Sequence, residues 1–327
     1  MKGSLHVATK VWPLREPFVI SRSVQTTCEV VVVALERSGQ VGRGEAVGVS
    51  YHGETLETML EQIESVRREV EAGVSRHELL AILPPGGARN AIDAALWDLE
   101  CKRRGVRAWQ IAGIAEPHKI ATNVTIGIRS LQAYEDRARE LADHPWIKIK
   151  VSDREPLEAV QAVRRGAPGA KLVVDANQAW SLKQLVELAP ALAELRVDLL
   201  EQPIAATDDA ELAHLDLPVP VCADEPANTA DDLPRLIDRY DFINIKLDKS
   251  GGLTAALEFA TAAQTAGLRL MVGCMVGGSL AMAPAMVLAQ LCEVADLDGP
   301  LLQAEDWPDG IAYDRGTMSL PASTLWG

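Results

Sequence analysis

The spacing of hydrophobic residues divides the chain into two unlike parts. In the first part, β-branched runs on either side of Ser38-Gly39, within residues 28–46, predict an antiparallel hairpin. Hydrophobic residues recur at helical intervals in 55–72 and 88–104, which predicts a helix in each segment. The N-terminal part is therefore expected to be an α+β unit.

From about residue 118, short apolar runs alternate with amphipathic segments, as is typical of βα units that build a parallel sheet. Eight strands are predicted, at 120–128, 146–151, 171–177, 198–203, 219–225, 242–248, 269–274 and 293–299. Eight strands at this spacing favour a closed barrel over an open doubly wound sheet. No Gly-x-Gly-x-x-Gly sequence follows a strand, so a nucleotide-binding fold is not expected.

Charge and cysteine content narrow the classes of partner. The 327 residues include 32 Lys and Arg against 46 Asp and Glu, a formal charge of −14, which argues against nucleic acid or an anionic membrane as partner. Five scattered cysteines without a Cys-x-x-Cys motif predict reduced thiols rather than a zinc site or disulfides. The N-terminus lacks a signal-peptide core, and the apolar run at 270–291 is interrupted by Gly and Pro. A soluble cytoplasmic protein is expected.

Three acidic residues stand at the ends of consecutive predicted strands: Asp175, Glu201 and Asp224. Successive barrel strands are neighbours, so these carboxylates are expected to converge at the barrel mouth and to need a cation. Hard oxygen ligands of this kind suit Mg²⁺, with Mn²⁺ as a possibility. Any one of them alone would more often be a helix N-cap. Three in register predict a metal site.

Lysines flank the acidic trio. Lys148 and Lys150 lie two apart on the preceding strand and therefore share a face, while Lys246 lies on the following strand. We expect Lys148 and the metal to lower the pKa of Lys150 toward the ~7–8 of a working general base. Lys150 and Lys246 on opposite sides of the metal would permit a 1,1-proton transfer α to a carboxylate, with Lys148 stabilising the enediolate.

These residues carry a resemblance to a known family. "KIKV" (148–151), "VVDAN", "LEQP", "CADE" and "NIKLDKSGGLTAA" (244–256), together with "ARNAIDAALWDL" (88–99), resemble the enolase superfamily in its muconate-lactonizing-enzyme-like subgroup. The resemblance implies an α/β fold: a (β/α)₇β modified TIM barrel over 116–300 and an α+β capping domain over 1–115. It further implies that segment 301–327 returns to the capping domain and that a mobile N-terminal loop closes the barrel mouth.

The resemblance also implies a substrate class. Asp296 and Asp298 in "ADLDGP" are similar to the motif by which dipeptide epimerases hold the substrate ammonium group. Arg22, the one charged residue of the loop at 18–27, stands about where L-Ala-D/L-Glu epimerases pair an arginine with the glutamate side chain. A small dipeptide is thus the expected partner. Further residues expected to line the pocket are Thr125, Cys274, Met275 and Ser279.

Other functions stay open at this stage. A cycloisomerase, dehydratase, o-succinylbenzoate synthase or N-acyl amino acid racemase would share the fold, but these would not need both lysines together with Asp-x-Asp. A non-catalytic metal-binding barrel and a metal-dependent aldolase are the alternatives from other classes. The barrel could also form a homo-oligomer, for which no motif sets the number of subunits.

Overall fold

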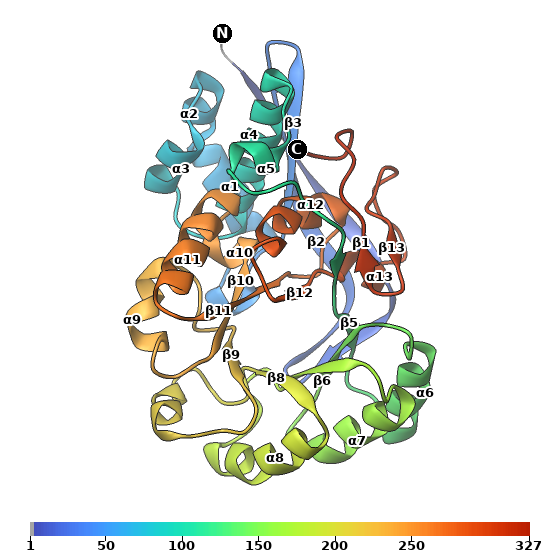
Figure 1. Cartoon of the computed structure of the whole chain (residues 1–327). Coiled ribbons are helices and arrows are strands. Elements are labelled where there is room, and N and C mark those ends of the chain that lie inside the picture. Colours follow the sequence, from blue (N-terminus) through green and yellow to red (C-terminus); the bar gives the residue numbers. More distant parts are fainter. Residues whose placement is uncertain (1–2) are drawn as a thin grey trace.

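The N-terminal part of the chain forms an antiparallel sheet covered by helices. The computed structural model describes residues 3–327. Its first sheet has the order β1 (Ser4–Ile20), β2 (Ser23–Arg37) and β3 (Gln40–Ala46). The helices that follow are η1 (Ser50–His52), α1 (Leu56–Ser65), α2 (Arg67–Ala72), α3 (Arg76–Ile82), α4 (Gly87–Arg104) and α5 (Ala108–Ile111). Apolar faces of β2, α1 and α4 form one buried cluster, so these elements constitute a domain with its own core. Figure 1 shows helix α4 beside strand β3 of this sheet.

The second part is the expected parallel barrel. Its strands are β5 (Val124–Ile126), β6 (Trp146–Lys150), β7 (Lys171–Asp175), β8 (Val197–Glu201), β9 (Val221–Ala223), β10 (Phe242–Lys246), β11 (Arg269–Gly273) and β12 (Val294–Asp296). They pair in sequence order in one eight-stranded sheet. Its two edges meet where Asn123 N donates to Ala295 O at 2.8 Å. The α/β barrel with an antiparallel N-terminal domain is therefore confirmed.

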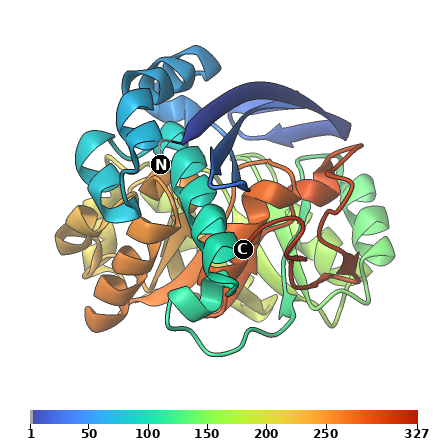
Figure 2. The ribbon, with the colours of Figure 1, turned by 90° about the horizontal axis from the view of Figure 1, so that it is seen from above.

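Helices surround the barrel strands, and the N-terminal domain lies against one side of the barrel (Figure 2). The surrounding elements are α6 (Leu131–Glu140), α7 (Pro156–Gly166), α8 (Leu182–Glu194), η2 (Asp209–His214), η3 (Ala230–Asp232), α9 (Leu233–Leu236), α10 (Leu247–Ser250), α11 (Leu253–Thr265), α12 (Ser279–Ala289) and α13 (Gly299–Leu302). Between β8 and β9 the connection is only the 3₁₀ helix η2. Among the described residues, no helix has both the length and the apolar character that crossing a membrane requires.

Two segments differ from the sequence-based expectation. Residues 18–27, expected as a loop, are the tip of a β1–β2 hairpin that turns at Ser21 and Arg22. Cross-strand pairs such as Val19 with Val24 hold this tip, and a strand held by pairing needs no apolar periodicity of its own. The strand expected at 120–128 is divided, because β4 (Ile120–Ala121) pairs with the hairpin β13 (Tyr313–Asp314) and β14 (Thr317–Met318), while β5 joins the barrel.

The barrel interior is layered. Inward-facing apolar side chains fill its lower part, and these are Trp146, Val173, Leu199, Cys222, Phe242, Met271 and Val294. We call this layer the barrel floor. Because strand side chains alternate, the residues two positions further along point inward as well, and apart from Gly273 these carry polar side chains. The barrel floor therefore closes one end of the barrel, and the polar residues lie at the other end, where the strands have their carboxyl ends.

Helix α4 joins the N-terminal domain to the barrel. Arg89 donates to the backbone oxygens of Ser250 and Gly251 at 2.6 and 3.0 Å. Asp93 accepts from Thr254, at 2.6 Å from Oγ1 and 3.1 Å from N. All the side chains in these contacts are buried, so the polar groups are paired rather than exposed to water.

Close packing against α4 also restricts β3. A Cβ on Gly42 would lie 2.1 Å from Ala95 O, and a Cβ on Gly44 would lie 2.1 Å from Ala91 O. The strand backbone can approach the helix to this distance only because both positions lack side chains.

Glu45 fastens three segments together near the barrel mouth. Its carboxylate accepts from Trp12 Nε1 at 3.2 Å, Trp307 Nε1 at 2.5 Å and Gly278 N at 2.7 Å. Burial raises the pKa of Glu45 despite these donors. The contacts link β1, the segment after α13 and the loop after β11. The last residues also reach the N-terminal domain, since Gly327 N donates to Asp98 Oδ1 at 2.9 Å.

Candidate active site

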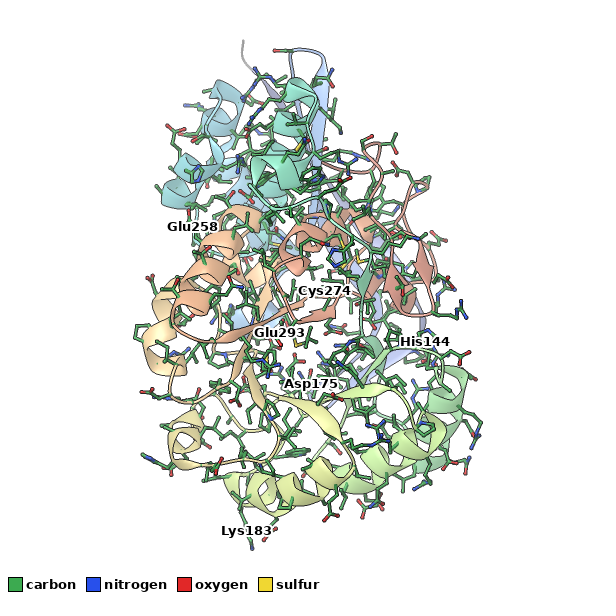
Figure 3. The ribbon with its side chains drawn as sticks, in the orientation of Figure 1. His144, Asp175, Lys183, Glu258, Cys274 and Glu293 are labelled. Atoms are coloured by element: carbon green, nitrogen blue, oxygen red, sulfur yellow. The ribbon has the colours of Figure 1, made fainter. Side chains whose placement is uncertain are left out.

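The three predicted acids lie side by side at the carboxyl ends of their strands. Asp175 is in register with Lys150 on one side and with Glu201 on the other, and Asp224 directly follows β9. All three acids are almost fully buried, and Asp175 lies near the centre of the molecule in Figure 3. Burial and the charge of Asp175 raise the pKa of Glu201 to about 7. The acids thus form one concentrated negative region inside the barrel mouth.

Lys148 lies within this negative region. Its Nζ is 2.7 Å from Asp296 Oδ2, 2.6 Å from Glu201 Oε2 and 3.1 Å from Asp175 Oδ2. Although burial opposes it, the charges of these carboxylates, with Asp296 contributing most, raise the pKa of Lys148 well above its usual value. Lys148 is therefore held as a cation.

Lys150 and Lys246 approach the same region from different strands. Lys150 Nζ lies 2.5 Å from Asp175 Oδ2, and Lys246 Nζ lies 2.8 Å from Asp224 Oδ2. Strands β6 and β10 are four positions apart in the eight-stranded order, so in a closed barrel they face each other. Burial opposes protonation of Lys246, but Asp224 raises its pKa well above the usual value. With only these protein groups around it, Lys246 is an ammonium group.

Two neighbours of the acids were not found from the sequence. Lys249 Nζ lies 2.7 Å from Asp224 Oδ1, and burial lowers the pKa of this lysine despite that contact. Asn244 donates from Nδ2 to Glu201 Oε1 at 2.9 Å and so orients that carboxylate. Both residues lie in the quoted segment 244–256, and Asn244 shares the inward face with Lys246 two residues later. This two-residue spacing from Lys246 could have identified Asn244 as a site residue from the sequence.

The acids carry the donor atoms that a divalent cation needs, although they are paired with lysines in this structure. Among residues 3–327, no group of three or more His, Cys, Asp or Glu side chains is gathered closely enough to hold a metal ion. The donors themselves are three buried carboxylates on neighbouring strands, a hard oxygen set that fits Mg²⁺. A cation there would replace the lysine ammonium groups as the counter-charge of these acids.

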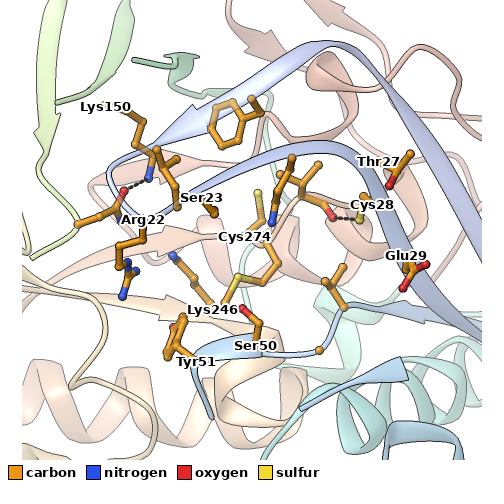
Figure 4. Close-up of a pocket in the computed structure, with 18 of the residues that line it drawn as sticks. Arg22, Ser23, Thr27, Cys28, Glu29, Ser50, Tyr51, Lys150, Lys246 and Cys274 are labelled. Carbon is orange, nitrogen blue, oxygen red and sulfur yellow. Dashed lines mark hydrogen bonds between the residues drawn. The ribbon is translucent and has the colours of Figure 1, made fainter. Parts of the chain in front are cut away.

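A cavity of about 570 Å³ opens between the barrel mouth and the β1–β2 hairpin (Figure 4). Lys150, Asp224 and Lys246 lie in its wall, together with Cys274 and Met275 from the loop after β11. The hairpin contributes a further side of this cavity, and its lining residues are Phe18, Ile20, Arg22, Ser23, Gln25, Thr27, Cys28 and Glu29. The cavity is large enough for a small polar molecule to contact both lysines.

Arg22 lies at the tip of the hairpin and forms an ion pair within the cavity. Its Nη2 is 2.6 Å from Glu225 Oε1, and the guanidinium lies over the Tyr51 ring at 5.6 Å from the ring centroid. Burial, followed by the charges of Asp224 and Asp175, raises the pKa of Glu225. Glu225 directly follows Asp224 in the chain, and its contact with Arg22 was not anticipated from the sequence.

The other predicted residues are distributed around this cavity. Asp298 Oδ2 accepts from Thr125 N at 2.6 Å, and both residues line a neighbouring hollow of about 470 Å³. Asp296 Oδ1 is buried and has no hydrogen-bond partner among the described residues. Ser279 is placed differently from the expectation. Its backbone N donates to Asp306 Oδ1 at 2.8 Å and its hydroxyl donates to Asp306 Oδ2, so it faces the C-terminal segment rather than the cavity.

Comparison with known proteins agrees with this geometry. Residues 2–113 match the model for the mandelate racemase/muconate lactonizing enzyme N-terminal domain, and residues 133–323 match the model described as enolase C-terminal domain-like. The chain is 40% identical to the L-Ala-D/L-Glu epimerase of Escherichia coli K12, covering 97% of this chain and 99% of the relative. It is 38% identical to an N-acetyl-D-glutamate racemase of Pseudoalteromonas, covering 91% and 95%.

A solved structure is similar over almost the full length. It comes from an Agrobacterium tumefaciens enolase family member described as homologous to dipeptide epimerases, with bound sodium, L-Ala-L-Glu and an ordered loop. The TM-score is 0.97 at 40% sequence identity, with 99% of this chain and 100% of that chain covered. The chain therefore belongs to the mandelate racemase/muconate lactonizing enzyme family of the enolase superfamily.

Proposed function

We propose that this chain is a magnesium-dependent dipeptide epimerase that inverts the α carbon of the C-terminal residue, with L-Ala-L-Glu and L-Ala-D-Glu as its substrates. The observation that carries the proposal is the pair Lys150 and Lys246. Both line one cavity, and they belong to strands that are four positions apart in the barrel. Two amines on opposite faces of a planar intermediate allow one to remove a proton and the other to return it from the far side.

The neighbouring groups fit the remaining requirements of this reaction. Lys148, held as a cation, stabilises the negative charge that develops when the α proton leaves. Asp175, Glu201 and Asp224 are the residues that would hold Mg²⁺. When bound, this ion supplies Lewis acidity for the substrate carboxylate and positive charge that favours neutral lysine bases.

The free oxygen of Asp296 supports recognition of an ammonium group. Oδ2 of Asp296 is already occupied by Lys148, while Oδ1 is buried without a partner. A buried, unpaired carboxylate oxygen is costly, and a substrate ammonium would satisfy it. Asp298, two residues further along, adds a second carboxyl group beside the same end of β12, although burial and the charge of Asp296 raise its pKa to about 7.

Arg22 supports an acidic second residue, because its guanidinium lies in the cavity wall and can form two parallel hydrogen bonds to a carboxylate.

The rival function is racemisation of an N-acylated glutamate, which the Pseudoalteromonas relative favours. An N-acyl group carries no ammonium for Asp296, so the two substrate classes are separable by experiment. Murein-peptide metabolism, a cytoplasmic location and a homo-oligomeric state stay predictions.

The test is proton NMR of L-Ala-L-Glu with enzyme and Mg²⁺ in D₂O, followed at the glutamate α proton. We expect exchange of that proton together with appearance of the L-Ala-D-Glu diastereomer. Lys150→Ala and Lys246→Ala should each abolish epimerisation. In each variant the remaining lysine can reach only one face of the α carbon, so exchange of the α proton with solvent should persist for one of the two diastereomers at most. Lys183→Ala is the matched control, because that side chain is 83% exposed on α8 and lies far from the cavity (Figure 3).

Two outcomes would overturn the proposal. Rapid racemisation of N-acetylglutamate with no turnover of L-Ala-L-Glu would replace the dipeptide with an N-acyl substrate. Absence of exchange in both compounds and in a panel of dipeptides with other second residues would remove the epimerase function. Chelation of Mg²⁺ with EDTA should stop exchange, and added Mg²⁺ should restore it.

A further inference from the structure

Another hollow, rich in arginine, lies in the N-terminal domain. Its volume is about 420 Å³, and it is enclosed by the end of β2, the turn between α2 and α3, and the last turns of α4. It shares no lining residue with the 570 Å³ cavity. The opposite end of α4, where Arg89 contacts the barrel, points toward the active-site domain. The hollow is therefore separate from the proposed catalytic site.

The charges around this hollow are strongly unbalanced. Four arginines and one histidine line it, with a single acid, Glu100. Both carboxylate oxygens of Glu100 are already used: Oε2 by Arg76 at 3.0 Å and Oε1 by Arg104 at 2.7 Å. Arg76 is further fixed by stacking on Trp97, 3.6 Å from the ring centroid. In a chain with a formal charge of −14, this local excess of positive charge is unusual.

Two of the guanidinium groups have no acidic partner among residues 3–327. Arg37 donates only from Nη2, to Val70 O at 2.8 Å, and its Nε is buried without an acceptor among the described residues. Arg103 forms no hydrogen bond or ion pair through its side chain within residues 3–327. Burial and then the charge of Arg103 lower the pKa of Arg37, so the positive charge of Arg103 disfavours the charged form of Arg37. An anion between them would remove this repulsion.

Helix electrostatics explain only part of the arrangement. Lys102, Arg103 and Arg104 occupy the last turn of α4, where cations interact favourably with the helix dipole. Arg37 comes from β2, and its one hydrogen bond, to Val70 O in the last turn of the short helix α2, leaves its Nε unused. Its position at the hollow brings guanidinium groups from separate elements to one space, which is how phosphate and carboxylate anions are commonly bound.

We infer that this hollow binds a small phosphate-bearing anion through Arg37 and Arg103. Phosphate is favoured over a single carboxylate because its higher charge and three accepting oxygens can satisfy more than one guanidinium at once. The inference is independent of the proposed epimerase function, since the two sites share no residue.

The test is isothermal titration calorimetry, in which the heat of binding is measured as sodium pyrophosphate is added to the full chain in magnesium-free buffer at constant ionic strength. Wild type should show saturable binding to one site. Arg37→Ala and Arg103→Ala should each weaken binding at least tenfold. Arg68→Ala is the matched control, because it removes the same charge from an exposed position on α2 that does not line the hollow. Arg103 is exposed and forms no side-chain hydrogen bond or ion pair within residues 3–327, so its loss should leave the fold intact.

The catalytic cavity also contains cationic side chains, namely Arg22, Lys150 and Lys246, so the experiment must distinguish the two sites. Binding that L-Ala-L-Glu displaces, or that Arg22→Ala abolishes, would place the anion in the catalytic cavity and overturn the inference. Equal affinity in wild type and Arg103→Ala, or no saturable heat in wild type, would overturn it as well. Repeating the titration with inorganic phosphate should give weaker binding with the same dependence on Arg103.

Discussion

The ion pair between Arg22 and Glu225 provides a direct test of how the substrate's second residue is selected. The two charged atoms are 2.6 Å apart, and the Arg22 side chain is 38% exposed whereas that of Glu225 is 5% exposed. Replacing Arg22 with alanine removes the positive charge at the hairpin tip. It also leaves Glu225 buried beside the space where an acidic second residue is proposed to lie.

The size of the effect follows from these contacts. A hydrogen bond to a charged group contributes roughly 1.5–3 kcal/mol, and the partial exposure of Arg22 favours the lower part of that range. At about 1.4 kcal/mol per tenfold change, a loss of ~1.5–2 kcal/mol lowers kcat/KM for L-Ala-L-Glu roughly 10- to 30-fold. Repulsion from the unpaired Glu225 adds to this loss. L-Ala-L-Gln has the same size but no charge, so its kcat/KM should change less than about threefold.

The assay is the initial rate of α-proton exchange for both dipeptides in D₂O. Arg22→Lys should fall between wild type and Arg22→Ala, because lysine keeps the charge but loses the planar fork. Adding Glu225→Gln to Arg22→Ala should restore part of the rate with L-Ala-L-Glu. Arg154→Ala, which removes an exposed arginine from the barrel, is the control. Equal losses for the acidic and the neutral dipeptide would refute the reasoning, because Arg22 would then act on the hairpin rather than on the substrate charge.

Three further predictions concern the packing that positions the site. Burial raises the pKa of Asp93 from 3.8 to about 6, so this acid holds its proton more tightly in the folded than in the unfolded chain. Relative to Asp93→Asn, wild type should therefore gain up to about 3 kcal/mol of unfolding free energy as the pH falls from 7 to 4, and a constant difference in urea titrations would contradict this. Glu45→Ala leaves three N–H donors unpaired and should cost roughly 2–5 kcal/mol in the same assay, with Glu45→Gln costing less. Gly42→Ala forces a methyl group against Ala95 O and should lower Tm, whereas Gly169→Ala, whose added Cβ meets nothing within 4 Å, should not.

The strand spacing and the polar residues that end each strand were sufficient to predict the barrel and to bring Lys150, Asp175 and Glu201 together. Both features are local in sequence, because each strand carries its own apolar run and its own terminal residue. The hairpin at 18–27 was missed for the opposite reason. Its tip is held by pairing between two strands and not by a hydrophobic pattern within either one.

Side-chain partners were the least predictable part of the site. The contact between Arg22 and Glu225 joins residues 203 positions apart, and no spacing rule connects them. Ser279 was expected in the pocket because it follows the seventh barrel strand. It instead faces Asp306, since the C-terminal segment folds back over the start of α12. Such contacts depend on how domains dock, which a single sequence does not encode locally.

The sealed barrel floor has a consequence for turnover. Apolar side chains fill the lower barrel, and the cavity that holds the lysines lies on the side of the hairpin, so a reactant reaches them and the product departs past the hairpin. In each catalytic cycle, the substrate therefore passes Arg22 at the hairpin tip on entry and the product passes it on release. A substitution that slows entry and release therefore lowers the rates of the forward and the reverse conversion by the same factor. Substrate entry and product release along one route can limit the rate of inversion. The equilibrium ratio of the two diastereomers is unaffected, because it depends only on their own free energies.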